Sequence, residues 1–144
     1  MSPLLNYTTS VAPFKTITEI QIALVKAGAR SVLTEYAPDG QPCGLAFLME
    51  TVIGPRQFSL PVHIERVEGV LRKDRVAPRF QSREQAQRVA WRILKVWVEA
   101  QLAIVRTEMV TLDQVMLPYM QSDDGRTIYE LYSERMLPAL SSAS

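Results

Sequence analysis

The stretch that decides the fold is SREQAQRVAWRILKVWVEAQLAIVRTEM, residues 82–109. It contains no glycine or proline, and its apolar residues recur at helical spacing, which predicts one long amphipathic helix from Ser82 to about Met109. Ser82 and Gln85 have the spacing of a capping box, in which each side chain satisfies a backbone N–H of the other residue. We expect the rest of the chain to pack around this helix.

The predicted helix has apolar side chains on two faces. One face carries Ala86, Ala90, Ile93, Trp97, Ala100 and Ile104, and the other carries Trp91, Val98, Leu102, Val105 and Met109. The narrow polar strip consists of Glu84, Arg88, Arg92, Lys95, Glu99 and Arg106. Such a helix packs on more than one side, so we expect it to cover a sheet and to meet another helix or another subunit. If Ile93 and Trp97 are buried, truncating either to alanine should cost about 2–5 kcal/mol.

Three short β-strands are predicted upstream of the long helix. Residues 30–37 alternate between two faces and are rich in β-forming residues, and residues 44–53 and 57–62 also place apolar side chains on one face. The loop at 38–42 contains proline and glycine, and a Gly-Pro pair at 54–55 marks the next turn. These strands should form an antiparallel meander.

Shorter helices are expected on both sides of this core. A Thr-x-x-Glu capping box predicts a helix over residues 16–27, and apolar spacing predicts another over 63–73. A further capping box opens a short helix at 111–118, and an amphipathic helix begins near Ile128. The fold class is therefore α+β, with a three-stranded antiparallel meander packed against a long amphipathic helix and with short flanking helices.

Length and composition indicate one domain. The chain has 144 residues, of which 47% are hydrophobic and 22% charged, and these values are ordinary for a folded protein. We expect an irregular N-terminal arm at residues 1–15, a single domain at 16–140 and a frayed tail at 141–144.

A cytoplasmic location is expected from three features. Cys43 is the only cysteine, so no intramolecular disulfide can form, which favours a reducing compartment. The N-terminus lacks the basic and apolar regions of a secretory signal. No apolar run approaches the roughly 18 residues that a membrane-spanning helix needs, so no membrane association is expected.

The residues that could carry catalysis are few, and we expect a protein that is not an enzyme. His63 is the only histidine, and it and Cys43 are expected near opposite ends of two adjacent strands. A Cys-His pair needs hydrogen-bonding distance and a third group that orients the base. The chain also lacks a zinc ligand set, a calcium loop at Asp123-Asp124 and a glycine-rich phosphate motif. We therefore expect no metal and no cofactor.

Charge is distributed unevenly along the chain. The net charge is only +1, but residues 72–95 hold eight basic and two acidic residues, a local net charge of +6. Residues 96–144 hold three basic and seven acidic residues, a local net charge of −4. Clustered Lys and Arg residues neutralise the phosphates of nucleic acids. The predicted nucleic-acid-binding residues are Arg72, Lys73, Arg75, Arg79, Arg88, Arg92 and Lys95.

Other interpretations of this basic segment remain open. Tyr36, Phe80 and Trp91 are candidates for stacking on bases, although burial in the core suits Trp91 better. A second interpretation is that the basic strip is a solvated face of an otherwise buried helix. A third is that it contacts a protein partner, for example by head-to-tail pairing of the basic middle of one chain with the acidic C-terminal part of another.

The order of a helix, a three-stranded meander and a long basic helix resembles the β-β-β-α core of phage-type single-strand annealing proteins. The likeness rests on the hairpin SVLTEYAPDGQPCGLAFLMET, the strand QFSLPV and the helix SREQAQRVAWRILKVWVEAQL, and it covers roughly residues 16–109. The chain also looks like small proteins encoded by phages and mobile elements. The resemblance implies a non-enzymatic, oligomeric protein that holds single-stranded DNA in a basic groove. The alternative is a structural assembly subunit that uses both apolar faces of the long helix.

Overall fold

A three-stranded antiparallel sheet forms one layer of the molecule. The computed structural model describes residues 2–142, and the side chains of residues 2–135. The strands are β1 (Ser31–Tyr36), β2 (Pro42–Thr51) and β3 (Gly54–Pro61), and they pair in the order β1-β2-β3. The predicted meander is confirmed. The expected Gly-Pro turn is displaced, however, because Gly54 and Pro55 begin β3 and pair with the end of β2.

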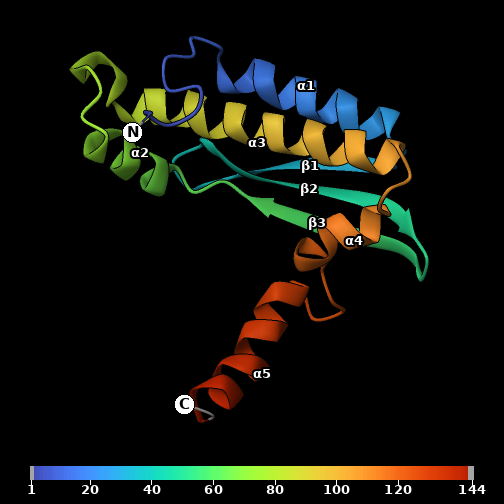
Figure 1. Cartoon of the computed structure of the whole chain (residues 1–144). Helices are drawn as coiled ribbons and strands as arrows, with labels where there is room; N and C mark the ends of the chain where they lie inside the picture. Colours follow the sequence, from blue (N-terminus) through green and yellow to red (C-terminus); the bar gives the residue numbers. More distant parts are fainter. Residues whose placement is uncertain (1, 143–144) are drawn as a thin grey trace.

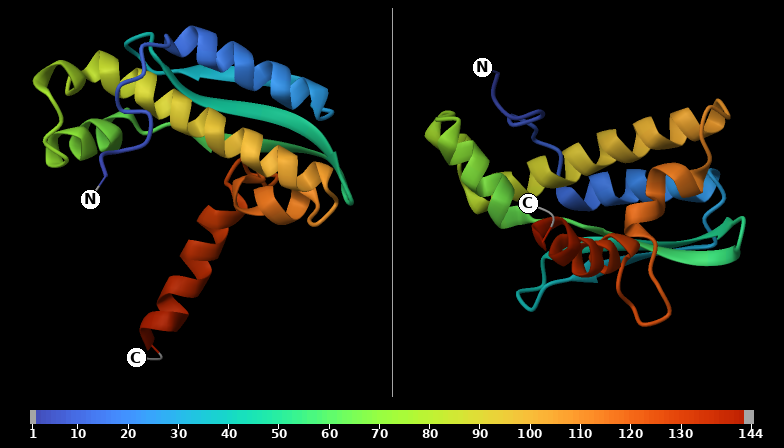
Figure 2. Two further views of the ribbon diagram at one scale, coloured as in Figure 1. Left: turned by 45° about the horizontal axis from the view of Figure 1, so that its top comes forward. Right: turned by 60° about the horizontal axis from the view of Figure 1, so that its bottom comes forward.

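Two helices cover one face of this sheet (Figure 1). They are α1 (Pro13–Lys26) and α3 (Arg83–Arg106), and they lie side by side in every view (Figures 1 and 2). The α+β prediction is therefore confirmed, with a long helix packed on a three-stranded sheet. The helix α3 ends at Arg106 rather than near Met109, and Glu108 follows with a positive φ of 64°.

The core lies between the two helices and the sheet. Phe47 and Phe58 occupy paired positions on β2 and β3, and their stacked ring centroids are 5.2 Å apart. Trp91 of α3 and Ile20 of α1 are fully buried in the same cluster. Burial of such large side chains supplies most of the driving force for folding in a domain of this size.

The two apolar faces of α3 have different environments. The face that carries Trp91 and Val98 is buried in the core. On the other face Ile93 and Trp97 are only half-buried, and Ile104 is exposed. Only the first part of that face, including Ala86, is buried, at the end of α3 that packs on α2 (Ile64–Lys73). The expectation that the long helix also meets another helix is confirmed, because both α1 and α2 pack on α3.

The beginning of α1 differs from the sequence prediction for a local reason. The helix starts at Pro13, where a proline fits because the first helical residues need no N–H partner. Thr16 is buried inside the first turn and its N–H donates to the carbonyl of Ala12, so the predicted capping box with Glu19 is wrong. The irregular arm consequently ends at residue 12 instead of 15.

The arm and the connector are fixed to the core by hydrogen bonds. The connector after α2 contains η1 (Pro78–Phe80), a short 3-10 helix. Ser82 accepts the N–H of Gln85 at 3.1 Å, which confirms the start of α3. The side chain of Gln85 does not complete the capping box. Its oxygen accepts from Arg88 at 2.9 Å, and its amide nitrogen donates to the carbonyls of Tyr7 and Thr9 at 2.8 and 2.9 Å.

The segment after α3 consists of short helices and a last helix that projects from the rest of the protein. The capping box of Thr111 and Gln114 opens α4 (Leu112–Met116), which continues into η2 (Leu117–Tyr119). The last helix, α5 (Ile128–Ser142), projects away from the sheet (Figures 1 and 2). The predicted frayed tail begins at 141, whereas α5 includes residues 141 and 142, and residues 143–144 lie outside the described part. No helix within residues 2–142 is long and apolar enough to cross a membrane.

Replacing Trp91 with alanine is expected to lower the free energy of unfolding by about 3–5 kcal/mol, because it leaves a large cavity in the core. Trp97→Ala on the same helix is the matched control and should cost clearly less, since this side chain is only half-buried. Urea unfolding followed by far-UV circular dichroism measures both values. Equal losses for the two variants would contradict the assignment of the core face.

Candidate functional site

The predicted nucleic-acid-binding residues fall into two groups in the structure. Arg88, Arg92 and Lys95 project from α3 on the side that faces α1, and we call them the helix group. The turn group lies at the end of α2 and in the connector before α3 and consists of Arg72, Lys73, Arg75 and Arg79. The two groups have different partners.

The helix group is held by groups of the same chain. Arg92 Nη1 lies 3.3 Å from Glu19 Oε1, and Lys95 Nζ lies 3.4 Å from Glu19 Oε2. Lys95 also pairs with Glu99 one turn along the helix. Arg88 donates a hydrogen bond to the side-chain oxygen of Gln85 at 2.9 Å. The helix group therefore links α3 to α1 and to its own first turn.

The pKa values in this network reflect the pairing. Burial raises the pKa of Glu19, but the hydrogen bond from Lys95 and the positive charges of Arg92 and Lys95 outweigh burial and place it below its usual value of 4.5. The pKa of Lys95 is raised by its hydrogen bond to Glu99, against an opposing effect of burial. A phosphate that approached Arg92 or Lys95 would have to compete with carboxylates already in place.

The turn group is more available to a partner. Arg72 pairs with Glu68 at 2.9 Å. Lys73, Arg75 and Arg79 are exposed, and among the described side chains no carboxylate lies within 4.0 Å of them. Arg75 ends the helix with a positive φ of 55°, a conformation that costs a non-glycine residue energy.

The three predicted stacking groups have different surroundings. Trp91 is fully buried in the core. Phe80 is already in contact with the guanidinium of Arg79, which lies 4.6 Å from its ring centroid, and with the edge of Tyr7. Tyr36 is 63% exposed at the end of β1 and remains the accessible aromatic residue of the three.

The expected separation of Cys43 and His63 is wrong. Because β2 and β3 run antiparallel, the start of β2 and the end of β3 meet, and the N–H of Val62 donates to the carbonyl of Cys43 at 3.0 Å. Cys43 and His63 line one cavity of about 230 Å³. No hydrogen bond joins their side chains within the described part. Residues 2–135 also contain no group of three or more His, Cys, Asp or Glu side chains that could hold a metal ion.

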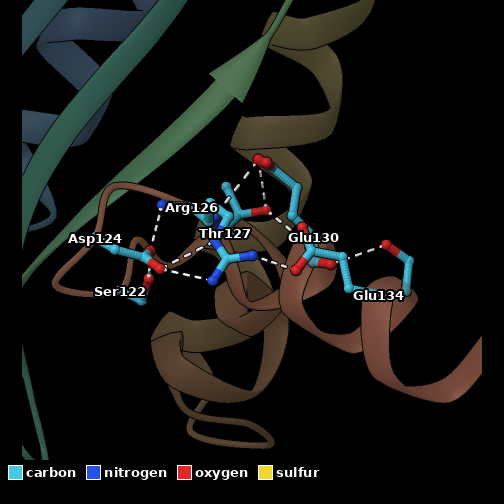
Figure 3. A network of polar contacts seen from close by, with 7 residues as sticks. Ser122, Asp124, Arg126, Thr127, Glu130 and Glu134 are labelled. Carbon is cyan, nitrogen blue, oxygen red and sulfur yellow. Dashed lines mark hydrogen bonds and ion pairs between the residues drawn. The ribbon is translucent and has the colours of Figure 1, made fainter.

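A polar network at the base of α5 was not anticipated from the sequence (Figure 3). Arg126 donates to Asp124 at 2.7 and 3.0 Å and also pairs with Glu134 on α5. These hydrogen bonds, together with one from Ser122, place the pKa of Asp124 far below its usual range. The sequence pattern that could have indicated this network is the Asp-Gly-Arg turn followed by an acidic residue eight positions after the arginine. The network fixes the direction in which α5 leaves the loop.

The exposed side of α5 carries aromatic residues. Tyr129 is 59% exposed and Tyr132 is 53% exposed, and their ring centroids lie 6.2 Å apart. The candidate site therefore has two parts, the cations of the turn group and the tyrosine surface of α5. No known protein family matches the chain, and comparisons with curated proteins and with solved structures likewise find no match.

Replacing Glu19 with glutamine should lower the melting temperature at neutral pH, because Arg92 loses its carboxylate partner and Lys95 loses one of two. Since the pKa of Glu19 is depressed by folding, its contribution is present above about pH 4.5 and is lost as the pH falls through the folded-state value. The difference from the unchanged protein should thus be largest at neutral pH and smaller in acid, below the usual pKa of 4.5. Differential scanning calorimetry at neutral pH and in acid measures it, and Glu35→Gln on the exposed face of β1 is the control. A difference that does not depend on pH would contradict the ion-pair role.

Proposed function

We propose that the protein is a non-enzymatic assembly subunit of the cytoplasm that self-associates through α5. The observation that carries the proposal is the position of this helix. It is 15 residues long, and its one extensive contact with another element in the described structure is with η2. At a rise of 1.5 Å per residue it extends about 22 Å.

A helix in this position needs a partner for stability. Isolated helices shorter than about 12–15 residues are marginal in water, and most helical stability in proteins comes from packing of an apolar face. Among the described side chains, the Arg126 network holds the first two turns of α5, through Glu134 and through contacts of Thr127 with Glu130. Packing of the exposed side of these turns on another chain would add to the stability of the helix.

The surface of α5 has the composition expected of an interface. Tyrosine is enriched at the centres of protein interfaces because it buries a large area and loses little side-chain entropy. Tyr129 and Tyr132 lie three positions apart and share one side of the helix. Their exposure in a single chain is best explained by burial in an assembly.

Replacing Tyr129 and Tyr132 together with alanine should weaken self-association at least about tenfold, as expected when interface anchors are truncated. Alanine has the highest helix propensity, so loss of the assembly would not follow from an intrinsic loss of helix. Light scattering and sedimentation velocity over a wide concentration range measure the association. Phe14→Ala, which truncates an 80% exposed aromatic residue on α1, is the matched control. A monomer at all concentrations, or equal effects of both changes, would contradict the proposal.

Nucleic-acid binding by the turn group is a second candidate function. It is supported by the exposure of Lys73, Arg75 and Arg79 and by the absence of nearby carboxylates among the described side chains. It also agrees with the resemblance to phage annealing proteins, which implies single-stranded DNA as the ligand and a role as an accessory factor of a phage or mobile element. In this case the helix group would contribute to stability rather than to phosphate contacts.

Changing Lys73, Arg75 and Arg79 together to glutamate should strongly weaken oligonucleotide binding at low salt. If each cation contacts one phosphate of a single strand, removing all three should reduce the slope of log K against log salt by about 2. Fluorescence anisotropy with single- and double-stranded oligonucleotides over a salt series measures this. The control changes three other exposed cations, Lys15, Lys26 and Arg106, to glutamate. Absence of binding by the unchanged protein at low salt would exclude this function.

A further inference from the structure

A groove with a volume of about 440 Å³ opens between the end of β3, α2, α3 and η2. We call it the α2–α3 groove. Its walls are formed largely by apolar side chains, including Leu60, Val67, Leu94 and Trp97. Tyr119 of η2 belongs to the same wall, and its ring lies edge-to-face with Trp97 at a centroid distance of 5.5 Å. Several of these side chains are only half-buried, so apolar surface remains open to water.

None of the charged or ionisable side chains that line the groove is a carboxylate. His63 and Arg66 are exposed and contribute the basic groups, and Tyr119 adds a phenol. An anionic group in the groove would therefore meet a guanidinium and an imidazole and no carboxylate. The α2–α3 groove thus combines an apolar interior with a basic rim.

Arg66 is available because the acids of α2 already have partners. Glu65 accepts from Arg83 at 3.2 Å, and Glu68 accepts from Arg72 at 2.9 Å. No carboxylate lies within 4.0 Å of Arg66 in the described part of the chain. An unpaired guanidinium beside apolar surface is well suited to a carboxylate, which it can bind through two parallel hydrogen bonds.

We propose that the α2–α3 groove binds a small apolar carboxylate, with the acid on Arg66 and the hydrocarbon against Trp97. The volume lies at the lower end of the range of about 300–1,000 Å³ that is typical of small-molecule sites. It suits a medium-length alkyl chain or a single aromatic ring rather than a large cofactor. Burial of that apolar group would cover the open wall, and the basic rim would select an acid over an amine.

Octanoate is the probe for the first test. Isothermal titration calorimetry of the full chain should show saturable binding with a dissociation constant of about 0.1–1 mM, the range expected for so small a ligand. Butyrate, which has the acid but little hydrocarbon, and octylamine, which has the hydrocarbon and the opposite charge, should each bind at least about tenfold more weakly. Absence of saturable binding, or equal affinity for octanoate and octylamine, would overturn the proposal.

Two pairs of variants test the position of the ligand. Arg66→Gln should weaken octanoate binding about tenfold, the effect of losing one charge-assisted contact, whereas Lys73→Gln on the same helix should leave it unchanged. Val67→Phe should block the groove, whereas Val70→Phe, one turn along α2 and outside the lining, should not. Thermal unfolding verifies that each variant is folded. Equal effects within a pair would place the ligand elsewhere and contradict the proposal.

The same variants separate a ligand site from a protein interface. If octanoate does not bind and Val67→Phe instead weakens self-association measured by light scattering, the groove is a surface for another chain and the ligand proposal is wrong. If octanoate binds and self-association is unchanged in Val67→Phe, the groove is a ligand site independent of α5.

Discussion

The packing of one face of α3 on the sheet is the interaction on which the other features depend. A three-stranded sheet is not stable with both faces in water, and Trp91 and Val98 cover the row formed by Phe47 and Phe58. Successive residues of an α-helix turn by about 100°, so once these two side chains point into the core every other side chain of α3 has a defined direction. The strip with Arg92 and Lys95 must then face α1, and the strip with Ile93 and Trp97 must face α2 and η2. The partners of each strip follow from this orientation.

This orientation determines which charges can meet a ligand. Glu19 on α1 lies opposite the basic strip and pairs with both Arg92 and Lys95. In a half-buried setting, such pairs are screened less than pairs on the open surface, so they help to hold the two helices together. Local clustering of positive charge in the sequence therefore overstates the charge that the folded protein presents. The cations of the connector, which have no helix packed against them, keep their charge exposed.

Local patterns in the sequence were sufficient for most of the elements. The meander, the long helix and the box of Thr111 and Gln114 depend on residues close together in the chain, and they agree with the structure. The errors arose where tertiary contacts compete with local ones. The side-chain oxygen of Gln85 accepts from Arg88 while its amide nitrogen donates to the N-terminal arm, so its capping box is not completed. Antiparallel pairing brings Cys43 to the end of β3 that carries His63. Periodicity could not show which face of α3 would remain partly exposed to solvent. The sequence pattern does not say where α1, α2 and η2 will pack.

The short segment η2 lies between the α2–α3 groove and the base of α5. Its Tyr119 forms part of the wall of the α2–α3 groove, and the turn after it bridges β3, with the N–H of Gln121 donating to the carbonyl of Gln57 at 2.8 Å. The base of α5 packs on the same segment. The segment η2 therefore contacts both the groove and the base of α5, and the edge-to-face contact of Tyr119 with Trp97 is where it meets α3.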